Sequence, residues 1–246
     1  MERPTPIFNT SMRKAATVAG LWLGDLWSLV VPRRCCGCDT ALLSHEESLC
    51  DGCLEELPRT RFNDDPMNAV ERLFHGKVPL TAAGALLRFG AHGMVQRILH
   101  HIKYAQDLEA AALLGRLMGE ELKQCTRFAG IDSVIAVPLH PRKERKRGYN
   151  QSRLLADGIL EALPLEPLHH ALQRVERTST QTRKGRLARW SNVKEAFEAA
   201  DTEALRGRHV LLVDDVVTTG ATAEACAAAI IAAPGARVSL FTAACA

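Results

Sequence analysis

The sequence predicts an α/β fold in which a parallel sheet is flanked by helices. Short apolar strands alternate along the chain with amphipathic helices, the order that builds parallel sheets with right-handed crossovers. The run His209–Val213 has the length and β-branched content of a strand that is buried on both faces. With 246 residues and 47% hydrophobic content, the chain is long enough to bury a full core.

Apolar periodicity and turn residues place the individual elements. We expect, in chain order, a strand over 83–89, helices over 94–104 and 108–122, a strand over 132–138, a loop over 140–148, a helix over 150–163 and a mobile loop over 173–192. A last strand–helix–strand unit begins with His209 and ends near Ala243. These elements together predict one α/β domain over 80–246.

The amino-terminal third is predicted to form separate parts. Residues 15–31 are largely apolar and follow Arg13 and Lys14, which imitates a signal peptide, but Asp25 interrupts the run and no small-residue cleavage site follows. The run is also too short and too polar for a membrane span. We therefore expect an amphipathic helix within 1–33, a cysteine module over 34–62, a linker over 63–79, no membrane span and a cytoplasmic protein.

Two Cys-x-x-Cys pairs lie close together within the cysteine module. Each pair can direct two thiolates at one ion, and four thiolates close a tetrahedral zinc site that has structural use rather than an open catalytic position. The predicted ligands are Cys35, Cys38, Cys50 and Cys53. A disulfide pair or simple packing are the alternatives, although disulfides need an oxidising compartment that the rest of the chain does not suggest. Cys36 is expected to be a bystander.

Two carboxylates and a small hydroxyl-rich loop follow the strand at 209–213. Asp214 and Asp215 can accept hydrogen bonds from the hydroxyls of a ribose or bind Mg²⁺ that accompanies a diphosphate. The next residues can turn backbone N–H groups towards a phosphate at the start of a helix. The predicted phosphate-binding residues are Thr218, Thr219, Gly220, Ala221 and Thr222. The alternative is an ordinary strand–turn–helix with acidic residues near the helix start.

Basic residues concentrate in two segments, although the net charge is only +3. This net charge is too small to require a nucleic-acid partner, and the simple interpretation of each segment is a solvated face. A neighbouring phosphate site makes anion binding the favoured interpretation. The first segment contains Arg142, Lys143, Arg145, Lys146 and Arg147, and the second contains Arg174, Arg177, Arg183, Lys184, Arg186 and Arg189.

Several segments together resemble the ComF family, bacterial competence-associated proteins with an amino-terminal zinc finger and a phosphoribosyltransferase-like domain. The resemblance covers nearly all of the chain from residue 35 onwards. It is carried by the two Cys-x-x-Cys pairs, Ile102-Lys103-Tyr104, the segment 134–140, Arg142, the segment 147–151, Gln181, Arg189, Asn192, Phe197 and the segment 212–222. The order apolar strand, Asp-Asp and Thr-Thr-Gly-x-Thr also resembles the fingerprint of phosphoribosyltransferases.

The resemblance implies a type I phosphoribosyltransferase-like sheet that binds phosphoribosyl pyrophosphate, or a related sugar phosphate, with Mg²⁺, beside a structural Zn²⁺ site. It also implies a loop over 178–192 that closes over the site. The residues expected to neutralise the pyrophosphate are Lys103, His140, Arg142, Arg147, Gln181, Arg183 and Arg189. Arginine and lysine suit this task because a diphosphate leaving group carries concentrated negative charge.

Two functions remain open from the sequence. One is an enzyme that transfers a phosphoribosyl group to an acceptor, for which the sequence shows no base-binding segment and no evident general base. The other is a non-catalytic competence protein that binds single-stranded DNA, with a DNA-uptake helicase as a partner, and keeps the sugar-phosphate site as a ligand pocket. The intact segment 214–222 favours ligand binding, and few aromatic residues are present for base stacking. The fold alone does not decide between them.

Overall fold

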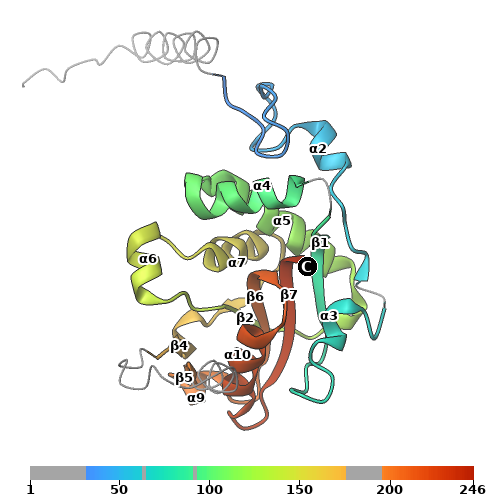
Figure 1. The fold of residues 1–246 in the computed structure, drawn as a ribbon. Helices are drawn as coiled ribbons and strands as arrows, with labels where there is room; N and C mark the ends of the chain where they lie inside the picture. The colour runs from blue at the N-terminus through green and yellow to red at the C-terminus, as the bar shows by residue number, and fades with distance from the viewer. Residues whose placement is uncertain (1–31, 63–64, 91–92, 176–195) are drawn as a thin grey trace, which may run out of the picture.

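Five parallel strands form the central sheet, in the order β1-β7-β6-β2-β3 (Figure 1). The computed structural model describes residues 32–62, 65–90, 93–175 and 196–246. The strands of the sheet are β1 (Ala83–Arg88), β2 (Ser133–Ala136), β3 (Glu166–Pro167), β6 (His209–Val217) and β7 (Arg237–Cys245). The pairings between neighbouring strands are all parallel, so the predicted parallel sheet is confirmed.

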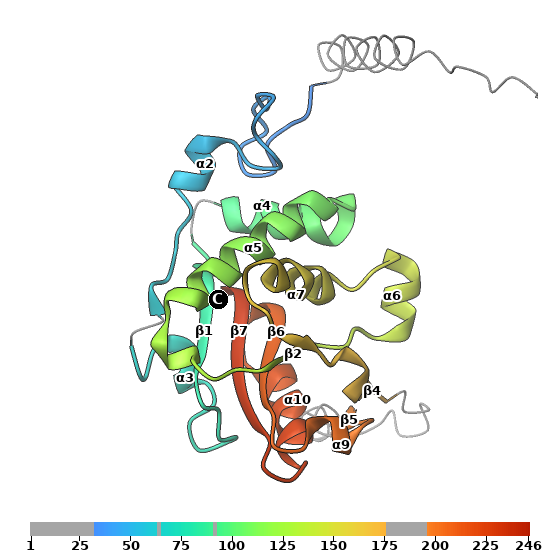
Figure 2. The same cartoon turned by 180° about the vertical axis from the view of Figure 1, so that it is seen from behind.

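Helices cover both faces of the sheet (Figures 1 and 2). One face packs against α4 (Met94–His100), α5 (Leu108–Gln124) and α7 (Gln151–Ala162), and the other packs against α3 (Ala69–Arg72) and α10 (Ala221–Ile231). Successive residues of β6 alternate between the two cores, because a strand points its side chains to opposite faces. This double burial explains why residues 210–213 of the strand are continuously apolar.

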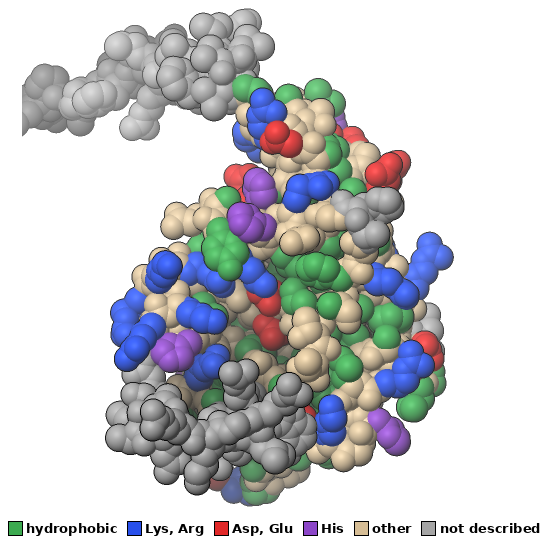
Figure 3. Space-filling view, in the orientation of Figure 1, with side chains coloured by type: hydrophobic (Ala, Val, Ile, Leu, Met, Phe, Trp, Pro, Cys, Tyr) green, Lys and Arg blue, Asp and Glu red, His purple; other side chains and the backbone are tan. Residues whose placement is uncertain are grey.

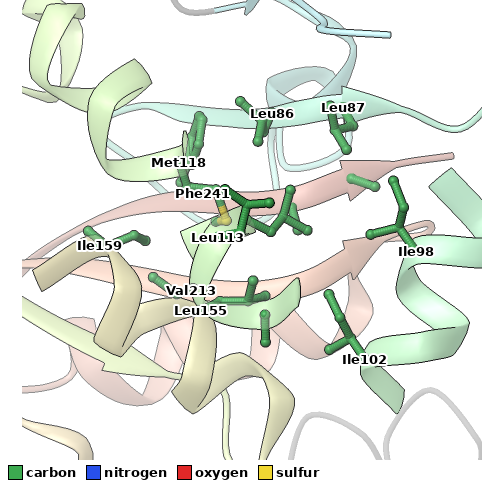
Figure 4. Close-up of a cluster of buried hydrophobic side chains, with 14 of the residues drawn as sticks. Leu86, Leu87, Ile98, Ile102, Leu113, Met118, Leu155, Ile159, Val213 and Phe241 are labelled. Carbon is green, nitrogen blue, oxygen red and sulfur yellow. The ribbon is translucent and has the colours of Figure 1, made fainter. Parts of the chain in front are cut away.

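The core between the sheet and α5 and α7 depends on close packing of large side chains. Met118, Leu155 and Phe241 are completely or almost completely buried there, as Figure 4 shows. The two helices approach one another at glycines, since a Cβ atom on Gly158 would lie 2.8 Å from the Cα atom of Gly115. This crossing fixes α7 in place, and α7 carries one of the residues of the candidate site.

Smaller elements complete the fold. A two-stranded antiparallel sheet pairs β4 (Leu172–Arg174) with β5 (Phe197–Ala199). The described residues also form the short α-helices α2 (Asp51–Glu55), α6 (Pro141–Arg147) and α9 (Thr202–Leu205) and two 3-10 turns, Thr126–Phe128 and His169–Ala171. Within the described ranges, no helix combines the length and the hydrophobicity that crossing a membrane requires. The predicted amphipathic helix within 1–33, except for its last two residues, and the predicted closing loop over 178–192 lie outside the described residues.

Three predictions of local structure were wrong. The expected loop over 140–148 contains helix α6, which the sequence hides because its residues after Pro141 are all charged and show no apolar periodicity. The strand predicted to end at Val213 continues to Val217, since Val216 and Val217 still pair with β7. The segment predicted as a linker carries α3, whose Val70 is fully buried, and this short helix therefore belongs to the core.

The expected mobile loop also starts too early. Residues 173 and 174 belong to β4 and pair with β5 rather than forming a loop. The rest of the predicted loop from residue 176 onwards lies outside the described residues.

Candidate functional site

Two adjacent carboxylates of β6 lie at the centre of the candidate site. Asp214 accepts hydrogen bonds from the Ser152 hydroxyl and from the backbone N–H of Asp215, each at 2.9 Å. The Asp215 side chain forms an ion pair with Lys103, whose Nζ atom lies 2.9 Å from Oδ2. Strand β6, helix α7 and the turn after α4 therefore meet at these carboxylates. The sequence predicted Lys103, Asp214 and Asp215 but missed Ser152, which no motif marks.

The surroundings of Asp214 disfavour its negative charge. Burial, and then the charge of Asp215, raise the pKa of Asp214 from 3.8 to about 7. Hydrogen bonds from the Asp215 N–H and the Ser152 hydroxyl, together with the charge of Lys103, act in the opposite direction. Near neutral pH this carboxyl group exchanges its proton readily, and a bound cation would shift it towards the ionised form.

A single π-helical turn, His101–Ala105, positions Lys103. The turn continues α4 and ends at Gln106, whose φ of 56° lies in the left-handed region. Ile102 is fully buried, and its carbonyl accepts a hydrogen bond from the Tyr149 hydroxyl. These contacts leave Lys103 on the side of the turn that faces β6. π-Helical turns are often found at functional sites.

The predicted phosphate loop connects β6 to α10. Thr218 and Thr219 are exposed, and Gly220 precedes the helix with a φ of 77°. A Cβ atom at Gly220 would lie 2.9 Å from the Phe74 ring, so both the conformation and the space require glycine here. Ala221 and Thr222 begin α10, whose first N–H groups have no partner within the helix. The loop therefore has the elements of an anion site next to the carboxylates.

The predicted basic residues separate into distinct places. His140 caps α6 by accepting a hydrogen bond from the Arg142 N–H at Nδ1, so both lie at the amino end of this helix. Arg147 lies at the carboxyl end, roughly 9 Å along the helix axis, where it donates a hydrogen bond to Gln151. Gln181, Arg183 and Arg189 lie outside the described residues.

The molecular surface around the site is hollowed and basic. Figure 3 shows lysine and arginine side chains gathered around a hollow in this face, with acidic side chains inside it. A pocket of about 380 Å³ lies beside Lys103. Its lining residues are Lys103, Tyr104, Gln106, Lys143, Lys146 and Arg147. The sequence did not single out Tyr104 as an aromatic group of this surface, because exposure of the π-helical turn has no sequence signal.

The four predicted metal ligands come together in the cysteine module. The sulfur atoms of Cys35, Cys38, Cys50 and Cys53 all lie within 4.8 Å of one another, and those of Cys38 and Cys50 are 3.7 Å apart. A tetrahedral zinc ion with Zn–S bonds of about 2.3 Å separates its sulfur ligands by about 3.8 Å, so the cluster fits zinc. All eight cysteines are free, and the cluster is therefore not bridged by disulfides.

Backbone contacts support the same cluster. The N–H groups of Gly37 and Cys50 each donate to the Cys35 sulfur at 3.3 Å, which stabilises thiolate charge. A Cβ atom on Gly37 would lie 2.9 Å from the Cys53 sulfur, so this position leaves room only for glycine. Cys36 stays outside the group, and burial, followed by the charge of Asp107, raises its pKa to about 12. The structure thus keeps Cys36 as a protonated, buried neighbour.

Comparison with known proteins identifies relatives. No protein-family model matches the chain. The chain is 36% identical over 128 residues to the DNA utilization protein YhgH of Escherichia coli O157:H7, which covers 51% of this chain and 56% of the relative. It is 33% identical over 130 residues to competence protein F of Haemophilus influenzae, covering 52% of this chain and 56% of the relative. These relatives support the ComF family for this chain.

A further ComF-family relative is competence protein ComFC of Bacillus subtilis, with 31% identity over 110 residues, 44% of this chain and 42% of the relative. The chain spans about half the length of the curated relatives that it matches. Among solved structures, it is similar to the glutamine phosphoribosylpyrophosphate amidotransferase of B. subtilis complexed with ADP and GMP, with a TM-score of 0.42 and 18% identity, covering 59% of this chain and 30% of that one. The predicted ComF resemblance is confirmed.

Proposed function

We propose that the site formed by β6 and the start of α10 binds phosphoribosyl pyrophosphate together with Mg²⁺. The observation that carries this proposal is the Asp214–Asp215 pair, which Ser152 and Lys103 hold directly before the Gly220 turn. Paired carboxylates suit the two hydroxyls of a ribose, and the turn suits its 5-phosphate. The two features follow one another in a continuous segment, residues 214–222.

The diphosphate of this ligand would lie towards the basic side of the site. Lys103 faces the carboxylates from that side, with its Nζ atom 2.9 Å from Asp215. Asp214 and Asp215 are the residues that would hold Mg²⁺, since carboxylate oxygens are its preferred protein ligands. Bound Mg²⁺ supplies positive charge that stabilises a leaving diphosphate. The raised pKa of Asp214 means that this cation would also compete with a proton.

The reaction class that this ligand allows is transfer of its phosphoribosyl group. The bond between the ribose C1 and the diphosphate oxygen breaks, pyrophosphate leaves with the electron pair, and an acceptor supplies the pair for the new bond at C1. The relatives are named for competence and DNA utilization. We accordingly propose that the chain acts in the handling of incoming DNA, with the sugar-phosphate site as its ligand-responsive part.

Thermal unfolding with and without phosphoribosyl pyrophosphate and Mg²⁺ tests the proposal. A ligand at about 100 times its Kd stabilises the native state by about 2.7 kcal/mol, which corresponds to roughly 5–10 °C for a chain of this size. The double variant Asp214→Asn, Asp215→Asn should lose this shift.

A matched control removes two exposed carboxylates instead. Asp39 and Asp157 have side chains that are 78% and 50% exposed, and both pair only with nearby arginines among the ion pairs of the described residues. The variant Asp39→Asn, Asp157→Asn should keep the full shift. An equal shift in the wild type and in the Asp214→Asn, Asp215→Asn variant would remove the carboxylates from the ligand site.

A further inference from the structure

The pocket beside Lys103 is built by two elements that are distant in the sequence. The π-helical turn and its C-cap contribute Lys103, Tyr104 and Gln106, whereas α6 contributes Lys143, Lys146 and Arg147. The hydrogen bond from the Tyr149 hydroxyl to the Ile102 carbonyl ties the chain after α6 to this turn. The volume of about 380 Å³ lies within the range of small-molecule sites. Two elements that a hydrogen bond connects therefore line the pocket together.

Positive charge converges on this pocket, and Asp215 is the one acid that forms an ion pair with any of its cations among the described residues. Four of its six lining side chains are cationic, and within the described part of the chain only Lys103 among them forms an ion pair. Lys143, Lys146 and Arg147 share one face of α6, because residues three and four apart lie together on a helix. The dipole of α6 favours cations near its carboxyl end, and Asp215 accounts for the position of Lys103, but among the described residues no acid forms an ion pair with Lys143, Lys146 or Arg147. An anion would relieve this repulsion.

An exposed aromatic ring adjoins the cations. Tyr104 is 67% exposed, the largest exposed fraction among the big apolar side chains that the structure describes. The Arg147 guanidinium lies over its ring at 5.5 Å, and the His100 ring lies 4.8 Å away with a tilt of 44°. Tyrosine rings and guanidinium planes both stack on nucleobases. The remaining lining residue, Gln106, offers an amide that can donate to and accept from the edge of a base.

We propose that this pocket binds a nucleotide, with its phosphate at Lys143 and Lys146 and its base against Tyr104 and Arg147. Inorganic phosphate alone would make no stacking contact with the Tyr104 ring, and an apolar ligand would not neutralise the cations of the pocket. The inference goes beyond the proposed function, since it assigns a second ligand to residues other than the carboxylates. The two sites meet at Lys103. The nucleotide is either free or one unit of a single strand, and both share this chemistry.

Binding titrations on the full chain carrying Asp214→Asn and Asp215→Asn, in which ribose 5-phosphate has lost the proposed sugar-phosphate site, test the proposal with three probes. Thymidine 5′-monophosphate carries the base and the phosphate, ribose 5-phosphate lacks the base, and a fifteen-residue oligothymidylate presents the nucleotide within a strand. We expect thymidine monophosphate to bind at least about five-fold more tightly than ribose 5-phosphate, the lower end of what one stacked base contributes. Tyr104→Leu keeps an apolar side chain and should abolish this preference. Its melting temperature should stay unchanged because the ring is exposed.

Charge variants test the phosphate end. Lys143→Gln with Lys146→Gln should weaken both monophosphates and reduce the dependence of binding on salt. Lys77→Gln with Lys123→Gln makes the same charge change at exposed positions outside this pocket and should alter neither property. Equal binding of ribose 5-phosphate and thymidine monophosphate, or unchanged binding in Tyr104→Leu, would overturn the nucleotide assignment.

The remaining outcomes identify the source and keep the two proposals apart. Tight oligothymidylate binding that competes with the monophosphate and weakens in Tyr104→Leu supports a strand as the source, whereas monophosphate binding without such competition supports a free nucleotide. The Asp214→Asn, Asp215→Asn variant should still bind thymidine monophosphate. If this variant loses the rise in melting temperature with phosphoribosyl pyrophosphate but still binds thymidine monophosphate, the two ligands occupy separate sites. Failure of one proposal is thus visible without failure of the other.

Discussion

The raised pKa of Asp214 predicts that the free energy of unfolding depends on pH. The substitution Asp214→Asn should remove this dependence. The pKa of Asp214 is raised from 3.8 to about 7 by burial and by the charge of Asp215. The unfolded chain therefore releases this proton near pH 4 and the folded chain only near pH 7, so the free energy of unfolding falls as the pH rises through this window. At about 1.4 kcal/mol per pKa unit, the whole window is on the order of 4 kcal/mol, an upper value because Asp214 is only half-buried.

The substitution Asp214→Asn keeps the shape of the side chain and an oxygen that can accept from Ser152, but it cannot ionise. Between pH 5 and pH 8, the wild type should lose about 3 kcal/mol more stability than this variant, since two pKa units lie within that interval below pH 7. Urea unfolding across this pH range, in buffer without Mg²⁺, measures the difference. The exposed change Asp157→Asn should follow the wild type at every pH. A constant difference between wild type and Asp214→Asn at pH 5 and pH 8 would refute the raised pKa.

Two further predictions concern the metal and the helix crossing. The purified chain should contain about one zinc ion, as measured by metal analysis. Cys50→Ser should lose this ion and have a lower melting temperature in thermal unfolding. Wild-type protein that contains no zinc when prepared without chelator would contradict this prediction. Gly158→Ala should destabilise by about 2 kcal/mol in urea unfolding because its Cβ would lie 2.7 Å from the Ala112 carbonyl oxygen, whereas Gly52→Ala, which meets nothing within 4 Å, should be neutral or stabilising. Equal effects of the two changes would argue against the close crossing.

The sheet was predictable because burial on both faces requires a continuous run of apolar residues, which is easy to recognise in the sequence. The run 210–213 is apolar throughout and identifies the strand, and Gly220 marks the turn to the next helix, whereas the carboxylates that suggest the end of the strand lie within it. Helix α6 leaves no such record, because it is held by the His140 cap and by Gly148 with a φ of 86° rather than by an apolar face. A run of charged residues without periodicity therefore predicts a loop where the chain forms a helix.

The candidate site was predictable where one segment carries it and hidden where the fold assembles it. Asp214 and Asp215 belong to a contiguous motif, and Lys103 belongs to a second short one. Ser152 is an unmarked residue of α7 that reaches Asp214 only because the glycine crossing with α5 sets the position of that helix. Tyr104 is exposed on the π-helical turn, and a single π turn within helical periodicity leaves no pattern of its own in the sequence.

The cysteine module is connected to the candidate site through the segment that carries Lys103. Before this segment, the Arg97 side chain of α4 donates to the Gly37 carbonyl at 2.6 Å, between two predicted zinc ligands. After it, the Ser48 hydroxyl donates at 3.1 Å to Asp107, which also caps α5. The module therefore contacts α4 before the π-helical turn and the cap of α5 after it. The turn itself forms the ion pair with Asp215. A metal that orders the module would therefore also restrain the position of the ammonium group beside the carboxylates of the candidate site.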